Sequence, residues 1–127
     1  MKKRTLLIAI SIIAPLLISA ANLPVAPNGI TYYPGYMKWN VIAPSYREDK
    51  GHIRIITGNE TAVAALHAGK NPLPDGSVLA KVAWKAEKHP SFPDATIPGA
   101  FVQVEFMVKN AKKYKNTGGW GFARFVG

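Results

Sequence analysis

The chain has 127 residues, a formal net charge of +9 and no cysteine, so thiol catalysis, thiolate metal ligation and disulfide bonds are excluded within these residues. Its basic residues are scattered, apart from a lysine-rich stretch at residues 109–115, and no basic stripe is interleaved with aromatic residues. Nucleic-acid binding is therefore not expected. A moderately basic surface favours an acidic protein partner or an anionic lipid face instead.

The beginning of the chain predicts a secretory signal peptide over residues 1–21. Residues 2–4 are basic, residues 6–18 are apolar, and small residues follow up to Ala21. The apolar stretch is too short for a transmembrane helix, and an uncleaved amino-terminal anchor is the alternative. Cleavage near Ala21 would leave one periplasmic or secreted domain over residues 22–127, with no stable membrane span. Of the 16 Lys and Arg residues, 13 would remain against seven Asp and Glu, a net charge of +6.

The next segments predict two strands. Residues 22–35 are rich in Pro, Gly and Asn and predict an irregular lead-in. Residues 36–43 carry aromatic and β-branched side chains and predict a strand, and Pro44 with residues 47–51 predicts a polar turn. Residues 52–57 predict the second strand, with Ile53 and Ile55 on one face.

A single helix is predicted over residues 59–68. Asn59 is a favourable N-cap, and Gly69 suits the position just after the helix ends. Three residues at helical spacing are expected to form its apolar stripe, namely Ala62, Val63 and Leu66.

Lys81 is unusual because it lies inside an otherwise apolar run, residues 78–84, launched by the turn at residues 74–77. A strand places Leu79, Lys81 and Ala83 on one face and Val78, Ala80, Val82 and Trp84 on the other. Neither face is polar, so both are expected to be covered, and a lysine there is costly without a role or a partner. Two interpretations stay open: an edge-strand charge, or a nucleophile aimed into a pocket.

The remaining sequence predicts two more strands. Residues 87–99 hold three prolines and no periodicity, and predict a loop. Residues 101–109 predict the longest strand, residues 112–116 a basic turn, and residues 120–126 a final aromatic strand. Together these elements predict a mainly-β or α+β domain, a small antiparallel sheet with one clear helix.

Glu105 is the second candidate site residue, because it lies in the middle of the longest predicted strand. One interpretation is a solvent-facing carboxylate, paired with a lysine on a neighbouring strand. The other is a pocket carboxylate with a raised pKa that relays protons.

Histidines and aromatic residues give weaker signals. No metal site is predicted, because the three histidines lack metal-ligand spacing and suit surface or capping positions: His52, His67 and His89. Four aromatic residues form either a carbohydrate-stacking platform or ordinary core packing, and packing is favoured: Tyr32, Tyr33, Tyr36 and Trp39.

Four blocks of sequence carry a family resemblance. They are WNVIAPSYR at 39–47, HIRIITGN at 52–59, GKNPLPDGSVLAKVAW at 69–84 and PGAFVQVEFMVKNAKKY at 98–114. Together with TGGWGF at 117–122, they resemble the cytochrome P-460 family of exported haem proteins. The resemblance covers nearly the whole of residues 22–127, in order and with compatible gaps.

The resemblance implies a mainly-β haem-binding domain that is often dimeric, with haem c attached through a Cys-x-x-Cys-His motif. In the enzymes of the family the iron oxidises hydroxylamine, electrons leave to a small carrier protein, and a lysine also bonds to the porphyrin edge. Relatives without that bond, the β-sheet type of cytochrome c′, bind nitric oxide. The lysine matches Lys81, and the carboxylate assigned to proton transfer matches Glu105. An apolar strand lowers the pKa of a lysine, which must be deprotonated to attack carbon.

The chain departs from the family at the attachment motif, because these residues contain no Cys-x-x-Cys-His. Covalent haem is therefore not expected on the chain as written, and non-covalent haem on His52, His67 or His89 has no positional support. The sequence is either cut short or that of a haem-free descendant. Whether it is an enzyme stays open. One alternative to haem chemistry is a haem-free exported binding or interaction module, which would bind its ligand in the ancestral haem pocket or on the tyrosine-rich segment. The other is an inactive remnant.

Overall fold

The computed structural model describes residues 22–127, and the predicted signal peptide lies outside the described residues. Five strands and one α-helix make up the described part: β1 (Asn40–Arg47), β2 (His52–Gly58), α1 (Glu60–His67), β3 (Val78–His89), β4 (Phe92–Lys109) and β5 (Trp120–Val126). Of three short 3-10 helices, one precedes β1 and two lie between strands: Tyr36–Lys38, then Glu48–Lys50 and Lys115–Thr117. Within residues 22–127, no helix is long and apolar enough to cross a membrane.

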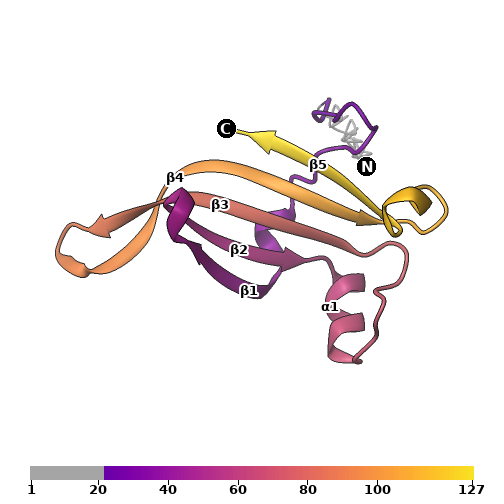
Figure 1. Cartoon of the computed structure of the whole chain (residues 1–127), viewed down its shortest axis with the longest axis horizontal. Helices are drawn as coiled ribbons and strands as arrows, with labels where there is room; N and C mark the ends of the chain where they lie inside the picture. The colour runs from indigo at the N-terminus through magenta and orange to yellow at the C-terminus, as the bar shows by residue number, and fades with distance from the viewer. Residues whose placement is uncertain (1–21) are drawn as a thin grey trace, which may run out of the picture.

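The strands form one antiparallel sheet in chain order, from β1 to β5 (Figure 1). Each strand therefore pairs with the strand before or after it, as expected when connections are short. The helix α1 lies at one end of the sheet, and an arm made by β3 and β4 extends from the other end (Figure 1). The mainly-β fold with one helix, predicted from the sequence, is confirmed.

One face of the sheet is the hydrophobic core. On β3, Val78, Ala80 and Val82 are buried, and they lie opposite Val108, Phe106 and Val104 on β4. The amino-terminal lead-in covers this face with aromatic rings that pack around Phe106, at centroid distances of 5.1–6.5 Å: Tyr32, Tyr33, Tyr36 and Trp39. These aromatic residues are therefore core packing, which is the interpretation the sequence favoured.

The helix α1 begins where the sequence predicts. The Asn59 side-chain oxygen accepts hydrogen bonds from the backbone N–H of Ala62, at 3.1 Å, and of Val78, at 3.0 Å. Gly69, just beyond the helix, adopts a left-handed φ of +66°. The predicted apolar stripe is partly wrong, because the helix buries Ala62 and Ala65 and leaves Leu66 exposed.

The predicted loop over residues 87–99 is wrong. β3 continues to His89 and β4 begins at Phe92, so these residues form a two-stranded arm with pairs such as Glu87 opposite Ile97. Proline disfavours a central strand because it lacks a backbone N–H. A two-stranded arm has a free edge on each side, where a missing N–H need not break the ladder.

The first strand is also shifted relative to the prediction. Residues 36–38 form a 3-10 helix, and β1 runs from Asn40 to Arg47, so Pro44 lies inside a strand. β1 is an edge strand of the sheet, which is where proline is tolerated. The predicted polar turn shrinks to Glu48–Lys50, followed by Gly51 with a left-handed φ of +59°.

Candidate functional site

A row of four side chains crosses the sheet on the face opposite the core. Lys81 on β3 pairs in register with Ile56 on β2 and with Glu105 on β4, and Glu105 pairs with Arg124 on β5. Directly opposed residues in antiparallel strands lie side by side on the same face. The register therefore brings both residues predicted for the site, Lys81 and Glu105, into contact.

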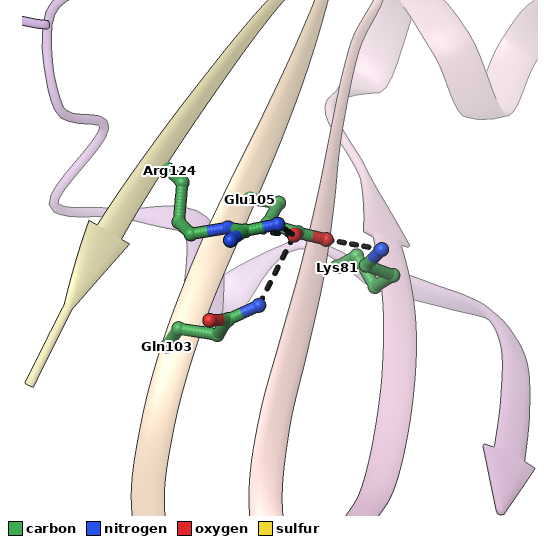
Figure 2. Close-up of polar contacts among 4 residues, drawn as sticks. All are labelled: Lys81, Gln103, Glu105 and Arg124. Carbon is green, nitrogen blue, oxygen red and sulfur yellow. Dashed lines mark hydrogen bonds and ion pairs between the residues drawn. The ribbon is translucent and has the colours of Figure 1, made fainter. Parts of the chain in front are cut away.

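Glu105 is the centre of a polar cluster (Figure 2). One carboxylate oxygen, Oε1, accepts hydrogen bonds from Arg124 Nη2 at 2.7 Å, Arg124 Nε at 2.9 Å and Gln103 Nε2 at 3.0 Å. The other oxygen, Oε2, forms an ion pair with Lys81 Nζ. Both oxygens of the carboxylate are thus engaged, and two cationic side chains face one anion.

The pKa of Glu105 lies below its ordinary value. Burial works to raise it, since the side chain is only 17% exposed, but the hydrogen bonds and charges of Lys81 and Arg124 outweigh burial. The predicted raised pKa is therefore wrong in direction, whereas the predicted pairing with a lysine on a neighbouring strand is confirmed. Glu105 is ionised at neutral pH and is held in one place by three side chains.

Lys81 is not an edge-strand charge, because β3 lies at the centre of the sheet. Its side chain is 38% exposed, and its face is only partly covered, contrary to the expectation that both faces of the strand are buried. The residue lines a pocket, as the alternative interpretation from the sequence expects.

The pocket lies over this face of β3, β4 and β5 and has a volume of about 520 Å³. Four residues on this face, one from each of four strands, form its apolar wall, and two core residues also reach it: Ile56, Leu79, Met107 and Phe122, with Phe106 and Ala123 from the core. Lys81, Glu105 and Arg124 are its polar groups. An apolar hollow with a few convergent polar groups is the usual form of a small-molecule site.

Arg124 and Gln103 complete the cluster, although the sequence pattern does not single them out. Arg124 has the spacing of an ordinary exposed strand residue in Trp120–Val126, and its side chain is 62% exposed. The available signal is the period of two along β4, which places Gln103 on the same face as Glu105.

The three histidines do not meet at the pocket. None of His52, His67 and His89 is among its lining residues. Across residues 22–127, no three His, Asp or Glu side chains come together in a way that could hold a metal ion.

Comparison with known families gives a match over most of the chain. The family described as Cytochrome P460 matches residues 33–127, a range that contains all five strands and every residue of the polar cluster. No curated protein matches the chain.

Proposed function

Because the chain belongs to the cytochrome P460 family, we propose that it is an exported domain whose pocket takes up haem and acts on, or binds, a small nitrogen compound. The observation that carries this proposal is the pairing of Lys81 with Glu105 inside an apolar pocket of the matched region. These are the two positions at which the family resemblance places a haem-linked lysine and a proton-transferring carboxylate.

The pocket suits the apolar face of a porphyrin. Its wall of Leu79, Met107 and Phe122 offers apolar contact, and its volume of about 520 Å³ falls in the range typical of small-molecule sites. Arg124 and Lys81 supply positive charge for the carboxylates of haem. Bound haem would supply an iron centre at which nitric oxide binds or hydroxylamine is oxidised.

Thioether attachment does not fit these residues, because none of the 127 is a cysteine. The pocket also contains no histidine, the commonest axial ligand of haem iron. Any haem held by these residues alone would therefore lack thioether bonds and be held mainly through apolar contact and charge, with Lys81 as the residue at which the resemblance places a covalent link.

Glu105 is the proton-handling residue of the proposed site. It is ionised at neutral pH, which is the form that accepts a proton, but its lowered pKa means that it holds that proton weakly. Arg124 and Gln103 fix Oε1, so Oε2 is the atom at which a proton can be taken up when Lys81 moves away. Lys81 therefore controls access to the acceptor oxygen.

Location and partners follow from the same proposal. We infer export to the periplasm or outside the cell from the basic and apolar beginning of the chain. The basic surface favours an acidic electron-carrier protein as the redox partner, and a homodimer is the proposed assembly. Co-purification with small acidic redox proteins and the mass of the protein in solution test these two partners.

Absorption spectroscopy tests the proposed haem site. The full chain should be expressed in the periplasm with the haem-maturation machinery, and purified protein should also be titrated with haemin. A Soret band that saturates with haemin is expected, without a thioether adduct by mass spectrometry. Absence of the band by both routes would exclude a haem function for this chain.

Two matched variants connect that band to the pocket. Phe122 lines the pocket and is 53% exposed, whereas Phe92 on the arm is 60% exposed and lies outside the pocket. Phe122→Asp is expected to weaken haemin binding by about tenfold or more, since it places a charge against the apolar ring. Phe92→Asp should bind like the parent protein. Equal binding by both variants would place haem elsewhere.

A second candidate function is a haem-free binding module built on the same pocket. Two observations favour it: the absence of cysteine, and the engagement of both Glu105 oxygens by neighbouring side chains. Saturable binding of an apolar ligand, together with no haemin binding, would support this candidate over the first.

A further inference from the structure

Lys81 differs from every other lysine of residues 22–127 in two respects. It alone among them forms an ion pair with a carboxylate, and it alone lines the apolar pocket over β3, β4 and β5. Lys70 and Lys85 are exposed, and the buried Lys109 lies over the ring of Trp120, 5.4 Å from its centroid. A primary amine, an adjacent carboxylate and an apolar wall are thus combined at one position only.

We propose that this pocket captures apolar aldehydes as a Schiff base on Lys81, with Glu105 as the proton acceptor and counter-ion. The amine is the nucleophile, the carboxylate handles its proton, and Leu79, Met107 and Phe122 hold the apolar tail of the aldehyde. This site shares the pocket with the proposed haem function, but its chemistry does not require haem.

The chemistry at Lys81 balances without an oxidant or a reductant. The Lys81 ammonium first passes one proton to Glu105 Oε2, with which it is already in contact, and this frees the nitrogen lone pair. The lone pair forms the C–N bond while the carbonyl π electrons move to oxygen. That oxygen takes up the proton held by Glu105 and a second proton from nitrogen, and it leaves as water. The product is a protonated imine.

The protonated imine inherits the ion pair of the original ammonium. It carries one positive charge on the same nitrogen, and Glu105 supplies the opposing charge. Arg124 and Gln103 keep the carboxylate in place through Oε1, so Oε2 stays directed at Lys81 throughout. The apolar wall excludes water from part of the adduct, which slows its hydrolysis.

Reductive trapping tests the proposal on the full chain without added haem. The protein is incubated with hexanal and cyanoborohydride, which reduces each imine to a stable secondary amine, and the modified lysines are identified by peptide mass spectrometry. Lys81 is expected to be modified about tenfold faster than Lys70 or Lys85, because the pocket positions the aldehyde next to the amine. Glycolaldehyde, which lacks an apolar tail, should show no such preference.

Three variants separate the parts of the site. Lys81→Arg keeps the positive charge and the partner of Glu105, and should abolish the selective adduct while the protein stays folded. Glu105→Gln should reduce the rate of Lys81 modification, relative to Lys70 and Lys85, by about tenfold, since the imine loses its counter-ion. Phe122→Ala should lower the preference for hexanal over glycolaldehyde. Circular dichroism of each variant verifies the fold.

Two results at Lys81 would overturn the proposal, and so would a third at Lys109. One is hexanal labelling that follows exposure, with Lys70 and Lys85 modified as fast as Lys81. The other is unchanged Lys81 labelling in Glu105→Gln, which would remove the carboxylate from the chemistry. Rapid labelling of Lys109 would count against it as well, because that lysine is buried without a carboxylate partner. A failure to bind haemin would leave the aldehyde result intact, so the two proposals fail separately.

Discussion

Lys81 on β3 lies directly opposite Glu105 on β4, and their side chains form an ion pair on the partly exposed face of the sheet. The pair is asymmetric. Glu105 keeps Arg124 and Gln103 on its other oxygen if Lys81 leaves, whereas Lys81 has no second carboxylate among the described residues. The carboxylate is therefore the fixed member of the pair, and the amine is the member that can change partner.

Glu105 is expected to make the protein sensitive to acid. Its folded pKa is lowered, so its stabilising contribution is present above the unfolded pKa, about 4.3, and is lost as the pH falls through the folded pKa. The free energy of unfolding should therefore fall less steeply between about pH 5 and pH 3 in Glu105→Gln than in the parent protein. Urea unfolding at a series of pH values measures this difference.

Glu87→Gln is the matched control for that experiment. Glu87 is exposed on the β3–β4 arm and forms no ion pair within residues 22–127. The control variant still contains Glu105 and should keep the acid-dependent loss that Glu105 causes. Equal slopes in Glu105→Gln and the parent protein would show that the ion pair contributes nothing to stability, as is observed for many surface pairs.

Phe106 is expected to be the most sensitive position of the core. It is fully buried on β4 and packs against the aromatic rings of the lead-in and against Phe125. Phe106→Ala should lower the free energy of unfolding by about 3–5 kcal/mol, through lost apolar burial and a cavity. Phe122→Ala, on the exposed face, should cost about 1 kcal/mol or less. Similar losses in both variants would contradict this assignment of the two faces.

Much of the fold can be predicted from local sequence patterns. The two-residue period of a strand over residues 78–84 gives the two faces of β3, and Asn59 with Gly69 gives the ends of α1 to within one residue. The prediction for residues 87–99 is wrong because prolines and a lack of periodicity normally indicate a loop, whereas pairing along an extended arm outweighs local preference. The prediction also starts β1 too early. Aromatic side chains in residues 36–39 are typical of a strand, but here they pack against the core from a segment outside the sheet.

The site could be predicted only in part. The sequence shows that Lys81 and Glu105 are charged residues within apolar strands. Their contact depends on strand register, which local patterns do not fix. Arg124 illustrates this limit: a shift of β5 by one residue would move it to the other face. The direction of the Glu105 pKa shift depends on the same register, because burial alone would raise it.

Asn59 is expected to stabilise the junction between α1 and β3. Its oxygen accepts from the N–H groups of Ala62 and Val78, and its amide nitrogen donates to the Gly76 carbonyl at 2.9 Å. Asn59→Ala should lower the free energy of unfolding by about 1–2 kcal/mol, since it removes a helix cap and two further hydrogen bonds. Asn59→Asp keeps the acceptor oxygen and should cost less. If urea unfolding shows that Asn59→Ala leaves the free energy of unfolding unchanged, water replaces all three hydrogen bonds.

Tyr36 is expected to limit stability at high pH. Burial raises its pKa to about 12, and its neighbour Tyr32 adds to the shift. A raised folded pKa means that the stabilising contribution is fully present below the unfolded pKa of about 10 and is lost as the pH rises through the folded value.

Between about pH 10 and pH 12, the parent protein should lose up to about 1.4 kcal/mol per pH unit relative to Tyr36→Phe, which cannot ionise. Unfolding by urea across this range, with phenolate absorbance followed in parallel, measures the loss. Tyr46→Phe removes an exposed phenol on β1 and should retain the full alkaline loss, because Tyr36 is still present. If Tyr36→Phe and Tyr46→Phe lose stability equally with rising pH, the Tyr36 phenol does not have the raised pKa and does not cause the alkaline loss.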